Sequence, residues 1–385
     1  MASTMAVRHL RPKIPTGRIV GIDMARTLAL VGMMGTHLYR PLYDGEASLA
    51  HQLAAGRASA LFAVLAGVSL AIITGGSRPV GGAELRARSV GIFVRSVLLY
   101  AIGVGLTHVG TPVAVVLQTY AVAMVLMIPF LGWRPRNLAI LAGTWVVAGP
   151  LLTVWVSTWW PTWTVTGWGT ATDHLLGIYP LLLWLTYFWA GLAIGRCDLR
   201  KTSTALWLIG VGATSAVAAV VISDRLVMRT PVLRALAEDL GSTDLGYLHM
   251  RLNWGLDGFI PGGSNWWLAI SSPHSGTPFD LATTLASALA VIGVCLVAAR
   301  ALPRSVALLS GAGAMSLTTY SLHATALSKW AWPPVETRSF WIHLAFFGGV
   351  GAVFRLAGLK GPLEWIVSLI STRATAAARR FTPPN

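Results

Sequence analysis

One stretch decides the fold of this chain: RIVGIDMARTLALVGMMGTHLYRPLYDGEASLAHQLAAGRASALFAVLAGVSLAIITG, residues 18–75. Two apolar spans flank a short polar loop, and both spans carry side chains that a lipid-facing helix excludes. Asp23 and Arg26 lie three residues apart and therefore share one helical face. His37 follows eleven residues later, about three turns on, so it lies on roughly the same face. Ionisable residues at membrane depth cost several kcal/mol unless they are paired or face a cavity, so this hairpin predicts a functional site.

Two further polar residues extend this site. His51 lies in the loop between the spans, and Arg57 opens the second span. Together with Asp23, Arg26 and His37 they form the set from which we expect catalysis. The simpler alternatives are a structural ion pair for Asp23 and Arg26 and a headgroup-facing side chain for Arg57.

Composition places the chain in a membrane. Of its 385 residues, 55% are hydrophobic and only 11% are charged, whereas a soluble globular protein carries about 25% charged residues. The mean hydropathy is +0.65. Residues 1–17 are basic, contain two prolines and lack the apolar core of a cleaved signal peptide, so we expect a basic cytoplasmic tail.

Apolar windows of about twenty residues predict an all-α, polytopic membrane protein with about ten transmembrane helices. Residues 18–358 are expected to form this transmembrane domain, followed by an interfacial helix and a cytoplasmic tail over residues 359–385. In that helix the membrane side would hold Trp365, Ile366, Leu369 and Ile370. The predicted spans are 22–43, 56–75, 89–109, 113–132, 138–158, 179–196, 203–223, 280–299, 304–326 and 339–358.

Basic residues set the expected orientation. With a cytoplasmic N-terminus and alternating spans, the cytoplasmic segments hold twenty Lys and Arg residues and the outer segments eight, as the positive-inside rule requires. Both termini are therefore expected in the cytoplasm, and the protein in the cytoplasmic (inner) membrane. The net charge of +15 is spread over the loops between spans, so it predicts membrane lipids rather than nucleic acid as partners. The sequence leaves a homodimer open.

The outer segments contain further candidate binding residues. Residues 157–179 and 223–280 form two long loops rich in tryptophan, and long loops with their own aromatic residues are more often functional than spacers. His323 lies late in the ninth predicted span, and His343 is expected at a surface or interface. The expected substrate-binding residues are Asp173, His174, Tyr179, His274, Tyr320 and His323.

Metal and disulfide chemistry have no support in the sequence. Cys197 and Cys295 each fall near the cytoplasmic end of a predicted span, and the chain contains no HExxH motif and no CxxC pair. We therefore expect no metal ion.

Several blocks, taken in order, resemble the transmembrane acyltransferase family of heparan-α-glucosaminide N-acetyltransferase and its bacterial branch. RIVGIDMARTLALVGMMGTH resembles the start of the family's first core helix, and GRASALFAVLAGVSLA resembles the second. YPLLLWLTYFWAGLAIGRCDL resembles the helix that opens with tyrosine-proline and ends in Gly-Arg. SSPHSGTPFDLATTLASALAVIGVCL, GAGAMSLTTYSLHA and the closing GPLEW follow in the family's order, so the resemblance runs from residue 18 to residue 366.

The resemblance implies an antiparallel helical bundle with an inner cavity. It also implies that an acyl group passes from cytoplasmic acetyl-CoA, or another acyl-CoA, to an amine or hydroxyl of an envelope glycan or glycolipid on the other side. By order in the chain, His51 occupies the place of the histidine that the lysosomal family member uses. That enzyme has an asparagine where His37 falls, and many members have a glycine where Thr27 stands.

Such a transfer has definite chemical needs. A general base near neutral pH is best supplied by histidine, here His37 or His51, and an acyl-histidine is the alternative route. Arg57 or Tyr320 would donate to the carbonyl oxygen as it gains negative charge. The phosphates of CoA need cations at the inner mouth, where the topology puts five arginines: Arg86, Arg88, Arg95, Arg134 and Arg136.

Two rival functions belong to other classes. The protein could be a transporter or flippase for a sugar-bearing or anionic envelope substrate, with Asp23, Arg26 and His37 as a proton relay. It could also be a non-catalytic scaffold for an envelope complex. Uptake without acyl-CoA would favour the transporter, and full function without His37 and His51 would favour the scaffold.

Overall fold

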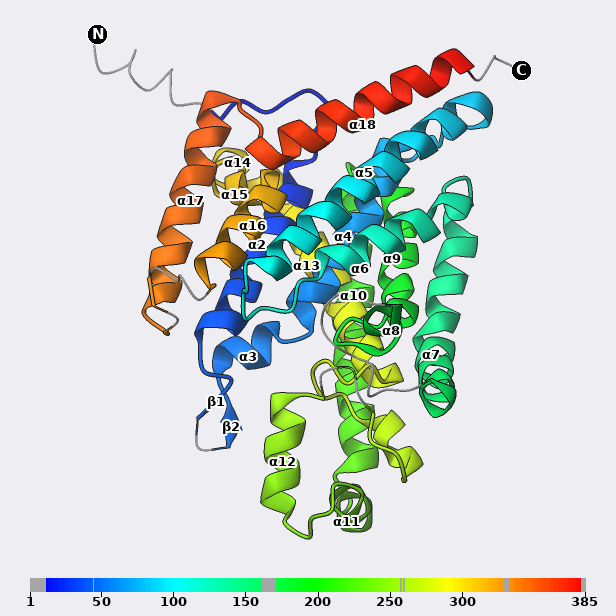
Figure 1. The fold of residues 1–385 in the computed structure, drawn as a ribbon, viewed down its shortest axis with the longest axis vertical. Coiled ribbons are helices and arrows are strands. Elements are labelled where there is room, and N and C mark those ends of the chain that lie inside the picture. Colours follow the sequence, from blue (N-terminus) through cyan, green and yellow to red (C-terminus); the bar gives the residue numbers. More distant parts are fainter. Residues whose placement is uncertain are drawn as a thin grey trace.

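The computed structural model describes residues 12–43, 45–160, 171–256, 258, 260–328, 333–334 and 336–381. Nearly all regular structure in them is helical, and most helices run roughly along one long axis (Figure 1). The last helix, α18 (Pro362–Phe381), lies at one end of the molecule, which we call the terminal end. Most of the basic tail predicted over residues 1–17 lies outside the described residues.

The first hairpin is more ordered than its sequence predicts. Helix α2 (Val20–Leu38) leads into strands β1 (Leu42–Tyr43) and β2 (Glu46–Ala47), then α3 (Leu49–Ala54) and α4 (Arg57–Ile73). The two strands pair antiparallel, so the fold is not purely α-helical. His51 therefore lies in the short helix α3 and not in a loop, because the side chain of Ser48 caps that helix by accepting a hydrogen bond from the His51 amide.

Helices α4 and α9 form the close-packed centre of the bundle. The chain reaches α9 (Leu181–Gly195) through α5 (Gly82–His108), α6 (Leu117–Leu126), the short helix η1 (Ile128–Phe130), α7 (Pro135–Trp159) and α8 (Ala171–Leu176). A Cβ on Gly191 would lie 3.0 Å from the Cα of Gly67 on α4, so only glycine allows this approach. Just after α9, Arg196 donates to the carbonyls of Ala71 and Thr74 and so closes the C-terminal end of α4.

The predicted outer loop 223–280 is a folded unit. Helix α10 (Thr202–Val227) runs beside α13 (Pro278–Ala301), and between them lie α11 (Thr230–Asp239), α12 (Leu245–Trp254) and η3 (Asn265–Ala269). We call α11, α12 and η3 the cap; they lie at the end of the molecule opposite α18, the cap end (Figure 1). The cap has its own apolar core around Leu236, Leu248 and Trp267.

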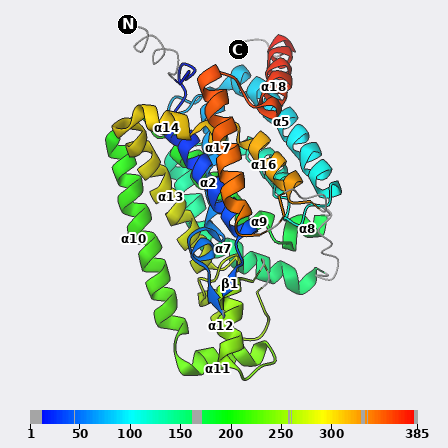
Figure 2. The ribbon, with the colours of Figure 1, turned by 90° about the vertical axis from the view of Figure 1, so that its left-hand side faces the viewer.

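The predicted span 304–326 is not one helix. It is divided into α14 (Pro303–Leu309), α15 (Gly311–Ala314) and α16 (Ser316–Ala326). The break has a packing cause, because Gly311 lies against the backbone of Gly351 on α17 (Ser339–Ala357) and Gly313 lies against the backbone of α2. Figure 2 shows α17 beside α2 at this site. Non-helical backbone at such a point is tolerated where protein groups satisfy it, and Thr27 accepts a hydrogen bond from the Gly313 amide at 3.0 Å.

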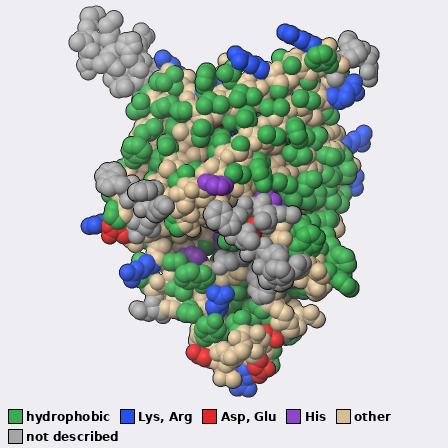
Figure 3. Space-filling model, in the orientation of Figure 1, with side chains coloured by type: hydrophobic (Ala, Val, Ile, Leu, Met, Phe, Trp, Pro, Cys, Tyr) green, Lys and Arg blue, Asp and Glu red, His purple; other side chains and the backbone are tan. Residues whose placement is uncertain are grey.

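The described helices support a multi-pass membrane protein. In the described ranges, six helical segments are long and apolar enough to cross a membrane, namely Leu49–Ile73, Gly82–His108, Pro135–Trp159, Thr202–Val227, Pro278–Ala301 and Ser339–Ala357. Helices α6 and α9 are apolar but shorter. Hydrophobic side chains cover a broad band of the surface; Lys and Arg lie at both ends of this band, and Asp and Glu gather over the cap (Figure 3). Each of the ten predicted ranges contains helix, while the number of crossings and the side of the termini stay predictions.

Candidate active site

A large cavity lined by described residues runs through the bundle. Its volume is about 790 Å³, within the range of roughly 300–1,000 Å³ that small-molecule sites occupy. At the terminal end it is lined by Arg18, Lys360 and Ser368, and at the cap end by His51 and Trp254. The cavity therefore extends from the terminal end to the contact between α3 and the last residue of α12 in the cap.

Asp23 organises the terminal end of the cavity. Its carboxylate is buried and accepts hydrogen bonds from three guanidinium groups. Arg18 Nε lies 2.5 Å from Oδ2, Arg26 Nη1 lies 2.9 Å from Oδ1, and Arg355 Nη2 lies 2.9 Å from Oδ2. Arg18 and Arg355 also donate to the carbonyls of Ala314 and Ser310, at the breaks between α14, α15 and α16. The Asp23 carboxylate thus joins α2, α17 and the segment that is divided into α14, α15 and α16, which we call the broken helix.

Positive charge exceeds negative charge in this part of the cavity. Its lining includes four cationic side chains and two carboxylates: Arg18, Arg26, Arg95, Lys360, Asp23 and Glu364. Glu364 is already used, since it accepts from the amides of Leu317 and Thr318 and caps α16. Arg95, near the middle of α5, makes no salt bridge with any described residue. Such an excess of cations beside a cavity is suited to an anionic ligand.

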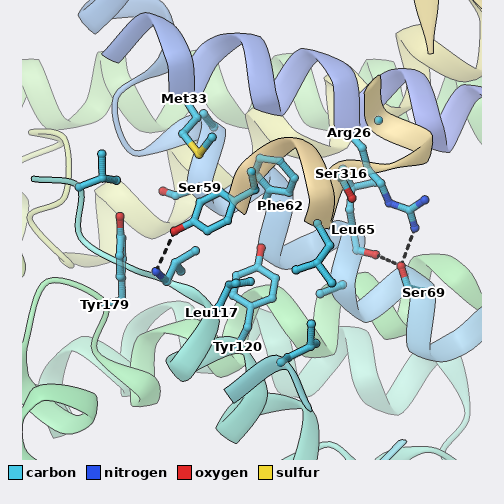
Figure 4. Close-up of a pocket in the computed structure, with 18 of the residues that line it drawn as sticks. Arg26, Met33, Ser59, Phe62, Leu65, Ser69, Leu117, Tyr120, Tyr179 and Ser316 are labelled. Atoms are coloured by element: carbon cyan, nitrogen blue, oxygen red, sulfur yellow. Dashed lines mark hydrogen bonds between the residues drawn. The ribbon is translucent and has the colours of Figure 1, made fainter. Parts of the chain in front are cut away.

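Hydroxyl groups and aromatic rings line the middle of the cavity (Figure 4). Arg26 donates to Ser69 Oγ at 2.7 Å. Tyr120 is buried and, among the described residues, its hydroxyl has no hydrogen-bond partner. Tyr320 accepts a hydrogen bond from the Val116 amide at 3.3 Å, which leaves its own hydroxyl proton available to donate. Tyr320 therefore offers a phenolic donor to a ligand in the cavity.

A hydrogen bond to a backbone carbonyl determines the tautomer of His51. Its Nε2 lies 2.9 Å from the carbonyl oxygen of Trp254, the last residue of α12. A carbonyl only accepts, so Nε2 carries the proton and Nδ1 carries the lone pair. In the described part of the chain, Nδ1 has no hydrogen-bond partner although the side chain is buried. His51 Nδ1 thus holds an unshared lone pair inside the protein, and the side chain lines the cavity.

His37 also lines the cavity, and two buried histidines lie behind it. His37 Nδ1 lies 3.1 Å from His323 Nε2, and His323 Nδ1 lies 2.8 Å from His343 Nδ1. His323 and His343 are both buried. The sequence predicts His343 at a surface or interface, but the side chain is buried because α17 packs against α15 and α2. The aromatic ring of Phe347 contacts both His323 and His343.

His274 is the third histidine of the cavity lining. It accepts a hydrogen bond from the Gly56 amide at 3.1 Å through Nε2. Its backbone φ is +53°, and it is the one non-glycine residue in the described ranges with a positive φ. Strained backbone of this kind occurs at sites where the surrounding structure fixes a side chain for a purpose. Tyr179, whose ring centroid lies 6.3 Å from that of His274, lines the same end.

The other residues predicted for the site lie elsewhere. Arg57 does not line the cavity and instead donates to the carbonyl oxygen of Gln52. Asp173 and His174 are also outside the lining; His174 lies 3.3 Å from Thr119 Oγ1. Of the five arginines predicted at the inner mouth, Arg95 lines the cavity, whereas the remaining four do not: Arg86, Arg88, Arg134 and Arg136. Arg88 pairs with Glu84, and the other three are exposed.

Several lining residues carry no sequence signal of a site. Arg18 and Lys360 look like ordinary flanking charges, and the acidic Glu364 lies in a segment predicted to be interfacial. Trp254 accepts a hydrogen bond from His51 through its backbone carbonyl. Every residue has this group, so the sequence does not mark Trp254 as a partner of His51. Tyr120 lies in an apolar run, where a tyrosine has no distinguishing neighbour.

The fold and the cavity together define a multi-pass membrane protein with acid–base groups in a buried chamber. The family model described as heparan-alpha-glucosaminide N-acetyltransferase, catalytic, matches residues 18–226. The chain belongs to this family and is therefore a membrane acetyltransferase. Among curated proteins, none matches the chain. The matched range contains α2 to α10, including His37, His51, Arg95 and Tyr120.

Proposed function

We propose that this protein transfers an acetyl or other short acyl group from cytoplasmic acyl-CoA to an amine or hydroxyl of an envelope glycan or glycolipid across the membrane. The observation that carries this proposal is the large cavity with cations at one end and a proton-accepting His51 at the other. A donor bound through its phosphates at the terminal end would extend its thioester toward the histidines. An acceptor would enter from the cap end.

The donor would be held by charge and by hydrogen bonds. Charge-assisted hydrogen bonds between guanidinium groups and phosphate oxygens are strong and geometrically specific. Arg18, Arg26, Arg95 and Lys360 offer them, and Asp23 fixes the first two of these side chains. The amides of the pantetheine arm would find partners in the hydroxyl groups of Ser69, Tyr120 and Tyr320. This arrangement requires the terminal end to be cytoplasmic, which agrees with the positive-inside distribution of Lys and Arg.

The transfer itself would use His51 as the general base. The acceptor attacks the thioester carbonyl carbon, and His51 Nδ1 takes the proton that the attacking N–H or O–H loses. The carbonyl oxygen gains negative charge and would accept a hydrogen bond from the hydroxyl of Tyr320. The carbon–sulfur bond then breaks, and His51 returns the proton to the sulfur of CoA. The Trp254 carbonyl, which accepts from Nε2, stabilises the imidazolium form between these steps.

The acceptor side is suited to a sugar. Trp254 and Tyr179 line the cavity beside His274, and aromatic side chains with one polar atom combine apolar contact area with hydrogen bonding. Asp173 and His174 lie outside the cavity lining and have no part in this proposal. On the cytoplasmic side, exposed Trp365, Ile366 and Ile370 on α18 support an interfacial position for that helix.

A transfer assay tests the proposal directly. Purified protein, acetyl-CoA labelled in the acetyl group and an α-glucosaminide or an envelope lipid extract should give labelled product and one equivalent of free CoA. Absence of both transfer and His51-dependent CoA release would contradict the proposal. Uptake of the acceptor into proteoliposomes that is unchanged without acyl-CoA would identify a transporter instead.

Arg95 provides the first mutational prediction. Arg95→Gln removes a cation that lines the cavity without leaving a partner carboxylate unpaired. A hydrogen bond to a charged group contributes about 1.5–3 kcal/mol, so the KM for acyl-CoA should rise about 10- to 100-fold, with a smaller effect on kcat. Steady-state kinetics over a range of acyl-CoA concentrations measure this. Arg136→Gln, at an exposed arginine outside the cavity, is the matched control and should leave KM unchanged.

A further inference from the structure

We propose that His37, His323 and His343 form a proton relay that removes the extra proton of an ammonium acceptor before acyl transfer. This inference rests on the proposed function and specifies its acceptor as a primary amine. The three rings are linked by contacts of 3.1 Å and 2.8 Å, and only His37 lines the cavity. His51 is a separate group with its own partner, Trp254.

The chain of rings has a definite chemical property. A neutral imidazole has one N–H and one lone pair, so a row of three can point its hydrogen bonds in either direction. In one direction His37 Nδ1 donates to His323 Nε2, and His323 Nδ1 donates to His343 Nδ1. His37 Nε2 then carries a lone pair. A proton accepted there can shift two protons along the row, so that the positive charge moves from His37 to His343.

An amine acceptor requires this second proton acceptor. A primary amine near neutral pH is mostly an ammonium ion, which has no lone pair to attack a thioester. It must lose one proton before attack and a second when the new C–N bond forms. His51 takes the second proton and returns it to the sulfur of CoA. The relay takes the proton that the ammonium ion loses before the attack. After the product departs, this proton returns along the row and leaves the protein through His37. The overall change is ammonium plus thioester to amide, free thiol and one released proton.

The surroundings of the row determine which groups its protons can reach. His323 and His343 are buried, where unpaired polar groups are costly, and the two ring contacts give each of them a partner. The uncharged titratable groups that line the same cavity as His37 are His51, His274, Tyr120, Tyr179 and Tyr320. The charged residues around α16, namely Arg95, Arg355, Asp23 and Glu364, lie toward its other end, because Glu364 caps Leu317 and Thr318. No described carboxylate forms an ion pair with any of the three rings.

The pH profile of two variants tests the relay. His323→Gln and His343→Gln interrupt the row but leave His37 and His51 in place. With the primary amine that gives the highest turnover, kcat/KM of the wild type should be nearly flat between about pH 7, where imidazole is neutral, and the pKa of the amine. In the variants it should fall about tenfold for each pH unit below that pKa, following the neutral fraction, and recover above it. Phe347→Leu, which changes the packing around both rings but removes no atom of the row, should keep the wild-type profile.

The outcomes separate the relay from the function on which it rests. Equal loss of activity at every pH, or profiles parallel to the wild type, would overturn the relay while leaving acyl transfer intact. A wild-type protein that acylates hydroxyl groups but no amine would also overturn the relay, whereas one that acylates neither would overturn the proposed function itself. If His323→Gln does not fold, as judged by its detergent melting temperature, His343→Gln decides, since that substitution lies at the far end of the row.

Discussion

Replacing His51 by alanine should lower kcat for acyl transfer by about 10²- to 10⁴-fold, the usual contribution of a positioned general base. The KM for acyl-CoA should change little, because His51 lies at the cap end of the cavity and the cations lie at the terminal end. His51→Gln should be as inactive as His51→Ala, since an amide cannot take a proton at neutral pH. Stopped assays with labelled acetyl-CoA measure both parameters.

A second histidine of the same region gives a control for this prediction. His249 lies on α12, the helix that ends at Trp254, but its side chain is exposed and does not line the cavity. His249→Ala should keep wild-type kcat. A His51→Ala protein with more than about a tenth of wild-type kcat and an unchanged melting temperature would refute the assignment of the base to His51.

Helix positions follow from the sequence because apolar length is a local property. Each predicted span contains helix, and α7 (Pro135–Trp159) matches its predicted range 138–158 closely. The predicted span 304–326 shows where apolar length fails to predict a helix. Its break depends on how close Gly311 and Gly313 come to α17 and α2, which are distant in sequence. The cap shows the same limit, since its helices are held by a core that includes Trp267, formed only when distant residues meet.

The site was predictable where a residue is unusual in itself. His37, His51 and Arg95 are polar groups beside or within apolar spans, and all three line the cavity. Partners were not predictable, because they come from other helices: the row behind His37 joins α2, α16 and α17. The expected pair of Asp23 with Arg26 is present, yet Arg18 and Arg355 complete the site from 5 and 332 residues away in sequence.

Asp23→Ala should destabilise the protein more than any other single substitution considered above. It would leave three guanidinium groups without a counter-charge, of which that of Arg355 is almost fully buried. Removing one partner of a buried ion pair costs about 3–5 kcal/mol, mostly because the remaining charge is uncompensated. We expect a large drop in detergent melting temperature and in the yield of monodisperse protein. Differential scanning fluorimetry and size-exclusion chromatography measure both effects.

Burial, rather than the number of ion pairs, is the cause of this expected effect, and Glu84 allows a direct comparison. Glu84 also pairs with two arginines, Arg88 and Arg379, but its side chain is 32% exposed. Exposed ion pairs contribute about 0–1 kcal/mol, so Glu84→Gln should leave the melting temperature nearly unchanged. Asp23→Ala combined with Arg355→Leu should recover part of the loss, because the most deeply buried cation is then removed as well. Equal effects of Asp23→Ala and Glu84→Gln would show that the Asp23 carboxylate does not hold the broken helix, α2 and α17 together.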